Sequence, residues 1–459
     1  MKIPFFTAIQ IGGGEKKSCR TSFLVLILLF EYLSLVPFYH LPDFSFSFGT
    51  LLFPPLKYLP FLFSIVLSAL FLYRILSPLG KFTNTQLDRY ILVFVAIRFL
   101  SVFSSEYYTV NLFGKAIYYS MTGPAMYYLI MFAVPDLFRL KIFLKIACWT
   151  CFFVSAYGVI GYFIGTDLFY QDIFEVYNPY HKGTSRVGST IGNPIVLASY
   201  MTLFIPICMF SLLQQEAPNK RFMYLIIIGI TLTGLLLTFS RGGWLSASIC
   251  IAIYLFPKLK IVPAVQIGRT SLALIVTLLM LLAFLSGALR NMGLGHVVEK
   301  TEARLSARTL DLSRMSAHTF RISQYKTTAE QLIQHPFLGI GFGTFTALFE
   351  KIKHESTPGK KISDATTTEN MFLMFACETG FIGVFSWIVL LVVLITRTFE
   401  NYSSSIDPLN RDLYLALLAG LGGFIVNMMT WDAMNHPAIR MCFWMLAGIA
   451  MRPTVCSQK

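Results

Sequence analysis

The stretch TFSRGGW, residues 238–244, places one arginine between two long apolar runs. Residues 222–240 are 19 positions without a charge, and residues 242–257 are another 16. Because a guanidinium is costly at the centre of a bilayer, Arg241 is expected where two membrane helices meet, at a membrane face or in a wet cavity. The adjacent Gly-Gly allows a sharp turn and the close approach of a ligand. The stretch therefore predicts a membrane protein with an arginine that receives an anion.

The composition of the whole chain agrees with that prediction. Of 459 residues, 55% are hydrophobic and 13% are charged, and the mean hydropathy is +0.65. A membrane span needs about 20 apolar residues, and this length predicts twelve helices. They lie near 21–39, 49–74, 90–106, 113–134, 143–165, 193–213, 222–239, 244–257, 270–289, 370–396, 412–430 and 438–451. The predicted fold class is an all-α polytopic membrane protein.

The basic residues predict how these helices are oriented. If residues 1–20 are cytoplasmic, the connections on that side and the tail from 452 hold 19 Lys or Arg, and the short opposite loops hold far fewer. Positive charge collects in cytoplasmic loops, so both termini are expected in the cytoplasm. The same distribution accounts for most of the net charge of +14 without nucleic acid as a partner.

Two segments on the external side are longer than simple turns. Residues 166–192 form a loop rich in tyrosine and glycine, and residues 290–369 hold 11 Lys or Arg, eight Asp or Glu and four histidines. Within the second segment, 318–334 has the apolar spacing of a helix, which His335-Pro336 should end. The predicted organisation is helices 1–9 in residues 1–289, a partly helical periplasmic cap over 290–369, and helices 10–12 in residues 370–459.

Several ionisable residues are predicted to gather at the external membrane face. Arg186 and Arg241 lie at helix mouths, Arg321 lies in the cap, and Glu369 lies where the cap returns to the membrane. Guanidinium groups bind phosphate oxygens bidentately and stabilise charge on a leaving diphosphate. A carboxylate can accept the proton of an attacking sugar hydroxyl. The group suits a lipid-linked diphosphate substrate, although each arginine is also suited to interfacial anchoring or to pairing with an acid.

Other residues have open roles beside this group. Glu369 could simply begin a helix, where the macrodipole favours an acid, and His318 in the cap is an alternative base. Asn370 follows Glu369, and the external turn before the last predicted helix carries Asp432, His436 and Arg440, any of which could line the same cavity. Arg98 lies inside a predicted helix, where an ionisable residue is functional, snorkels or is paired. No metal-ligand motif or nucleotide-binding motif is present, so no metal and no cofactor are predicted.

Five segments, taken together, resemble a known family. They are SRVGSTIGNPIVLASYM (185–201), LTFSRGGWLS (237–246), RISQYKTTAEQLIQHPFLGIGFGTF (321–345), TENMFLMFACETGFIGVFSWIVLL (368–391) and WDAMNHPAIRMCFWMLAGIAM (431–451). In this order and spacing they resemble the O-antigen ligase and polymerase family of bacterial inner membranes. The resemblance covers roughly residues 180–451.

The resemblance implies a metal-independent membrane glycosyltransferase with its active site on the periplasmic side. Such enzymes transfer an undecaprenyl-diphosphate-linked glycan to a sugar hydroxyl, on a growing glycan or on lipid A-core. The family's arginines map onto Arg241 and Arg321, with Arg186 as a third, as diphosphate contacts. At the position where the ligases of the family have a pattern similar to His-Asn-x-x-Leu, this chain has Glu369-Asn370-Met371-Phe372-Leu373. That difference favours a polymerase of surface polysaccharide, which could have a chain-length regulator as a partner, over a ligase to lipid A-core or protein.

A transporter or flippase is the alternative from another class of protein, because twelve helices with both ends inside also fit one. The large insertion argues against it, since it lies between helices 9 and 10 and not between two six-helix halves. The loop between helices 2 and 3 also lacks the spacing of major-facilitator transporters. An enzyme is therefore the preferred hypothesis.

Overall fold

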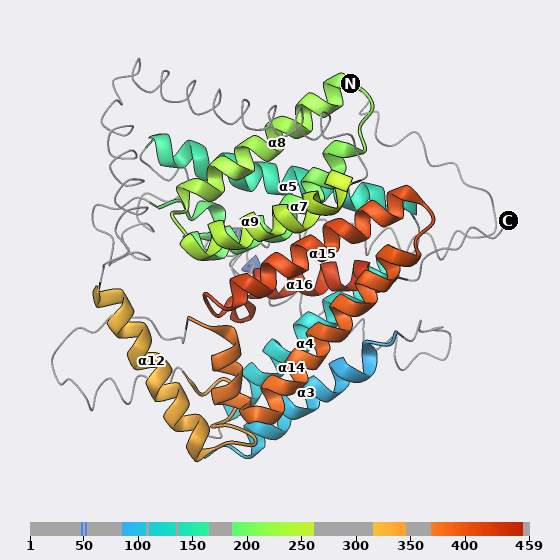
Figure 1. The fold of residues 1–459 in the computed structure, drawn as a ribbon. Helices are drawn as coiled ribbons and strands as arrows, with labels where there is room; N and C mark the ends of the chain where they lie inside the picture. The colour runs from blue at the N-terminus through green and yellow to red at the C-terminus, as the bar shows by residue number, and fades with distance from the viewer. Residues whose placement is uncertain are drawn as a thin grey trace.

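A computed structural model of the protein describes residues 47–48, 51–52, 85–106, 110–134, 137–164, 186–260, 315–345 and 369–452. This part is helical apart from one antiparallel pair, β1 (Ser47–Phe48) and β2 (Leu51–Leu52). Its α-helices are α3 (Asp88–Phe103), α4 (Val110–Ala133), α5 (Leu137–Ile164), α7 (Pro194–Leu213), α8 (Pro218–Leu237), α9 (Arg241–Leu255), α12 (Met315–Gln334), α14 (Met371–Ser404), α15 (Pro408–Met428) and α16 (Pro437–Ala450). The short 3-10 helices are η4 (Ser189–Ile191), η5 (Phe256–Lys260) and η6 (Ala433–Asn435). Figure 1 shows their arrangement.

Membrane-spanning character is clear in five of the described helices. By length and composition α5, α7, α8, α14 and α15 are apolar enough to cross a bilayer, and α16 is a shorter apolar helix. Several helices begin at a residue whose side chain accepts backbone N–H groups of the first turn. Asn193 caps α7 in this way and Asp407 caps α15. These caps satisfy donors that a helix leaves without an internal partner.

Nine of the twelve predicted spans coincide with described helices, and the predicted spans 21–39 and 270–289 lie outside the described residues. The span predicted at 49–74 begins too early, because Leu51–Leu52 is paired as a strand. Pro54 and Pro55 follow directly, and the residue before a proline is disfavoured in a helix. The rest of that span lies outside the described residues, so the count of twelve stays a prediction.

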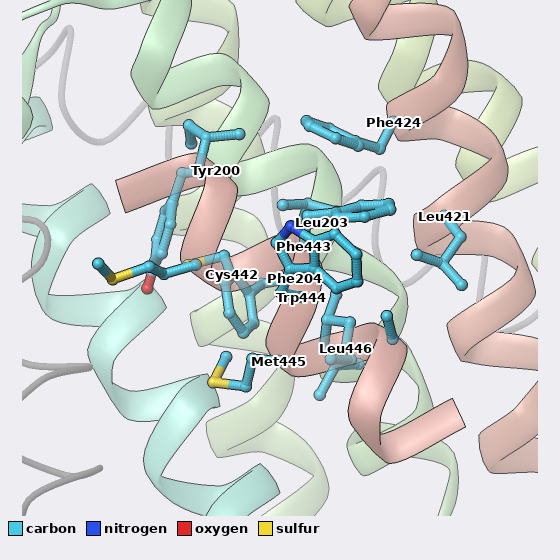
Figure 2. Packing of buried hydrophobic residues seen from close by; sticks show 14 of the residues in the cluster. Tyr200, Leu203, Phe204, Leu421, Phe424, Cys442, Phe443, Trp444, Met445 and Leu446 are labelled. Atoms are coloured by element: carbon cyan, nitrogen blue, oxygen red, sulfur yellow. The ribbon is translucent and has the colours of Figure 1, made fainter. Parts of the chain in front are cut away.

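The core of the bundle lies around the last helix. Every residue of α16 is buried, and so is 94% of the apolar window of α7. Figure 2 shows Phe443 and Trp444 of α16 among Phe204 of α7 and Phe424 of α15. The rings of Phe424 and Phe443 lie 5.4 Å apart between centroids. An apolar helix buried on all sides is the interior element of a bundle, so α16 is the centre that the other helices surround.

One long apolar helix, α14, is broken near its start. In α14, Gly380 has a φ of +66° and a ψ of −172°, so the predicted continuous helix over 370–396 is wrong at this point. The break leaves backbone groups on both sides without helical partners, and residues 335–345 supply them. The N–H groups of Ile340 and Gly341 donate to the carbonyls of Cys377 and Glu378, at 2.9 and 3.1 Å. The carbonyl of Pro336 accepts from Phe381 at 2.8 Å.

This inserted segment, which we call the 335–345 loop, ties α12 to the membrane helices. α12 ends at Gln334, directly before His335-Pro336, as predicted. The hydroxyl of Ser105, just after α3, donates to the carbonyl of Ile340 at 2.6 Å. Figure 1 shows α12 beside the first part of α14, on the side where α8 and α15 end. Backbone groups in lipid must be satisfied internally, so the loop completes α14 rather than merely connecting to it. The cap boundaries of 290–369 stay a prediction.

Candidate functional site

Arg241 is the first residue of α9. Ser240 precedes the helix, and its hydroxyl accepts the N–H of Gly243 at 3.2 Å. The side chain of Arg241 is exposed, and it forms no hydrogen bond or ion pair with any residue that the structure describes. A cation at a helix N-terminus gains nothing from the helix dipole, so its position is not explained by helix stability. The guanidinium is available to an external anion.

The two glycines after Arg241 serve packing rather than a turn. Both lie inside α9, and a Cβ on Gly242 would collide with the side chain of Thr430, just after α15. A Cβ on Gly243 would collide with Ala198 of α7. The predicted sharp turn at Gly-Gly is therefore wrong, and Phe239 makes the turn instead, with a φ of +49°. The close approach fixes Arg241 beside the end of α15.

Arg186 lies at the same mouth as Arg241. Its Nε donates to the carbonyl oxygen of Thr238 at 2.8 Å, and the N–H of Val187 donates to the carbonyl of Leu237 at 3.1 Å. These carbonyls belong to the C-terminal end of α8, which attracts a cation. Two arginines from different segments thus lie around the three-residue connection from α8 to α9.

The turn between α15 and α16 joins this mouth to the start of α14. Asp432 is buried and accepts a hydrogen bond from Nδ2 of Asn435 at 3.2 Å. The same Nδ2 lies 3.0 Å from Sδ of Met374, in the first turn of α14. The ends of α8 and α15 and the starts of α9 and α14 lie toward the left of Figure 1. The turn that carries Asp432 therefore contacts α9 through Thr430 and the start of α14 through Asn435.

Arg440 lies in the interior, on α16. Its Nε donates to Oγ1 of Thr122 at 3.1 Å, and one terminal nitrogen donates to the carbonyl of Met434 at 3.0 Å. Its guanidinium carbon lies 4.5 Å from the ring centroid of Tyr119. Only 1% of the residue is exposed. These contacts hold the 430s turn against α4, and a contact with substrate stays a prediction.

Glu369 and Asn370 begin the broken helix. Asn370 is the N-cap of α14, and its Oδ1 accepts the N–H groups of Phe372 and Leu373 at 3.0 and 3.2 Å. Glu369 is half-buried and has a φ of +47°. A side chain in this left-handed region costs about 1–2 kcal/mol relative to a helical residue. Because Asn370 is held as the N-cap, the backbone of Glu369 is held in place directly before the helix.

Backbone strain collects at this end of the bundle. Among the described residues, three non-glycine residues have a positive φ: Ser189, Phe239 and Glu369. Each lies within three positions of a predicted site residue, namely Arg186, Arg241 and Asn370. Strained residues persist where the surrounding structure holds them, and they gather at functional sites. The positions of these three residues therefore indicate a functional site, and no sequence motif predicts this backbone strain.

α12 carries two of the predicted site residues. His318 and Arg321 both lie on α12, three residues apart and hence on neighbouring positions of one helix face. Their side chains lie outside what the structure describes. A cavity that Arg321 or His318 shares with Arg241 and Glu369 stays a prediction.

Glu378 is a buried acid that our sequence analysis did not assign to the site. Its Oε1 accepts the N–H of Phe345 at 3.3 Å, at the end of the 335–345 loop. Arg98 of α3 is also buried and lies over the rings of Phe342 and Phe375, at 4.1 and 4.8 Å from the centroids. Two buried ionisable side chains, Glu378 and Arg98, thus contact the 335–345 loop from α14 and α3. The sequence signal that could have identified Glu378 is its position as an acid inside an otherwise apolar run of a predicted helix.

In the described ranges, no group of three or more His, Cys, Asp or Glu side chains is placed to hold a metal ion.

Among known families, residues 225–388 match the family model described as O-antigen ligase. The matched range contains Arg241, Arg321, Glu369 and Glu378. No curated protein matches the chain.

Proposed function

We propose that this chain transfers a glycan from an undecaprenyl diphosphate to a sugar hydroxyl, and the match of residues 225–388 to the family model described as O-antigen ligase supports this proposal. The family consists of ligase- and polymerase-type membrane glycosyltransferases. The apolar helices and the family together indicate a multi-pass membrane protein. We place it in a bacterial inner membrane, with the site on the periplasmic side and the termini in the cytoplasm.

The observation that carries the proposal is the exposed guanidinium of Arg241 beside Arg186, at the end of the bundle where Asp432 and Glu369 also lie. A diphosphate needs several cationic donors at once, and planar guanidinium forks match its oxygens. Arg321 of α12 would complete the set from the cap. A carboxylate close to these cations would repel a bound anion, so it does not suit a simple anion-binding site. A transfer reaction needs such a group to accept the proton of the attacking hydroxyl.

The reaction follows from those roles. The hydroxyl oxygen of the acceptor attacks the anomeric carbon, and the bond from that carbon to the diphosphate oxygen breaks. The diphosphate leaves with the electron pair of the broken bond. Its negative charge is stabilised by Arg241, Arg321 and Arg186. Glu369 accepts the proton of the hydroxyl. Asn370, His318, Asp432 and Arg440 are proposed to orient the sugars, and the reaction requires no redox step.

Polymerisation is the proposed form of the transfer. Glu369 stands where the family's ligases resemble histidine, so the proton acceptor here is a carboxylate. When the purified chain receives labelled lipid-linked repeats, we expect a ladder of longer lipid-linked glycans without any lipid A-core. Product that forms only when lipid A-core is added would identify a ligase. Movement of intact glycolipid across a liposome membrane without a new glycosidic bond would identify a flippase.

Glu369→Gln is expected to lower the rate of transfer by about 10²–10⁴-fold, which is the usual contribution of a positioned base. The amide keeps the size of the side chain but cannot accept the proton. The measurement is the turnover of lipid-linked repeats by protein of equal yield and equal melting temperature. Glu330→Gln, an exposed glutamate on α12, is the matched control. Normal turnover by the Glu369→Gln protein would show that Glu369 is not the group that accepts the proton.

A further inference from the structure

A cavity lies at the opposite end of the bundle from Arg241. It has a volume of about 520 Å³ and is formed by the starts of α5, α8 and α15 and the end of α7. These helix ends lie toward the right of Figure 1. α8 has 20 residues, and at 1.5 Å per residue its two ends are about 30 Å apart. The cavity is thus a full membrane thickness away from the site proposed above, and that function makes no use of it.

Three lysines line the opening of this cavity. Lys141 and Lys145 are separated by one turn of α5, and Lys220 lies in the first turn of α8. All three side chains are exposed, and none forms a hydrogen bond or ion pair within the described ranges. Like charges at i and i+4 repel each other, and a cation is disfavoured at a helix N-terminus. An anion between them would relieve both effects.

Acidic residues do not line the cavity. None of its 16 lining residues is Asp or Glu, although Asp412 of α15 is close to Gln214. Asp412 is already engaged, because it forms an ion pair with Lys258 and accepts hydrogen bonds from Gln214 and Tyr254. The positive charge at the opening is therefore not neutralised by a protein carboxylate in this part of the structure.

The inner wall of the cavity is apolar. Leu140, Leu144, Phe210 and Leu413 line it as buried side chains, and Trp149 marks its depth along α5. From Leu137 to Trp149 the helix rises about 18 Å, at 1.5 Å per residue. This is more than half the thickness of the hydrocarbon core of one bilayer, which is about 30 Å. A ligand that fills the cavity needs a charged head and a long apolar part.

We propose that this cavity binds one anionic glycerophospholipid of the bilayer. Its phosphate lies among Lys141, Lys145 and Lys220, and an acyl chain lies against Leu144, Phe210 and Leu413. The amide oxygens of Gln214 and Gln215, which also line the cavity, accept from hydroxyls of the head group, since their Nε2 groups already donate to Asp412 and to the carbonyl of Ser211. The volume lies within the range of about 300–1,000 Å³ that is usual for ligand sites. A neutral phospholipid lacks the net charge that the three lysines select.

The test uses the full chain in nanodiscs, with phosphatidylglycerol or phosphatidylcholine brominated on the acyl chains. Bromine quenches tryptophan at short range, so lipid in the cavity quenches Trp149. We expect phosphatidylglycerol to quench at a lower mole fraction than phosphatidylcholine, and Trp149→Phe to remove that difference. The triple variant Lys141→Gln, Lys145→Gln, Lys220→Gln should need at least tenfold more phosphatidylglycerol, since each lysine near a membrane contributes to anionic-lipid binding.

A matched control separates this site from general attraction to an anionic surface. Arg89 and Arg411 are exposed cations near the same end of the bundle, and Arg397 there is half-buried and forms an ion pair with Glu400. None of these three arginines lines the cavity. Their combined replacement by glutamine should leave the quenching curve unchanged. Equal quenching by the two lipids, or equal weakening in both triple variants, would overturn the proposal. Because turnover plays no part in this measurement, its outcome is independent of the proposed glycan transfer.

Discussion

Arg241→Lys is expected to lower the turnover of lipid-linked glycan about 10²–10³-fold, the usual cost of removing one transition-state donor. An ammonium keeps the charge but cannot form two parallel hydrogen bonds to a diphosphate. Stability should change little, because Arg241 is exposed and makes no hydrogen bond or ion pair to the described protein residues. The measurement is the initial rate, together with the melting temperature of the same preparation.

The control for Arg241 is Arg221→Lys, at the other end of α8. It should change neither turnover nor stability. Arg241→Ala should reduce turnover further than Arg241→Lys, because it removes the charge as well. If both Arg241 variants turned over substrate at the normal rate while their melting temperatures were unchanged, the leaving diphosphate would have to be stabilised elsewhere.

Gly380→Ala is expected to cause the largest loss of stability, on the order of 3 kcal/mol or more. Its φ of +66° is strained for any residue with a Cβ, and that Cβ would overlap the carbonyl of Phe337 in the 335–345 loop. A backbone neighbour cannot move aside as a flexible side chain can. We expect a fall in melting temperature and the loss of transfer, because the loop would separate from the break in α14.

Gly114→Ala is the matched control for Gly380. Gly114 lies inside α4, and a Cβ there would meet nothing within 4 Å. Alanine is favoured over glycine in a helix by about 1 kcal/mol, so this variant should be as stable as the parent or slightly more stable. Equal melting temperatures for the two alanine variants would show that the loop is not held at Gly380.

The helices of this fold are readable in the sequence because their apolar runs are long and their ends carry local signals. Pro336 predicts the end of α12, and Arg241 marks the boundary between α8 and α9. The break in α14 has no such signal. Glycine is tolerated inside apolar helices, and the segment that stabilises Gly380 lies about 40 positions earlier in the chain. Only tertiary contacts decide that the helix breaks there.

The site shows the same division between local and tertiary information. The sequence predicts that Arg186 and Arg241 lie at helix mouths on the same side of the membrane. It does not predict that both lie beside the connection from α8 to α9, where Arg186 donates to the carbonyl of Thr238 and Arg241 begins α9. It does not predict that Arg440 lies in the interior against Tyr119 and Thr122, because its direction depends on how α16 packs. Glu378 was not selected because its partner, the N–H of Phe345, is distant in sequence.

The burial of α16 has a consequence for biosynthesis. Its central neighbours are made first, since α7 begins about 240 residues before α16. At about 5–20 residues per second, α7 waits for on the order of 10–50 s before α16 is made. During that time we expect lipid to contact the faces of α7 and the other neighbours that Phe443 and Trp444 later cover. The packing of α16 is therefore expected to exchange lipid for protein, after the described helices that precede it in the chain have been made.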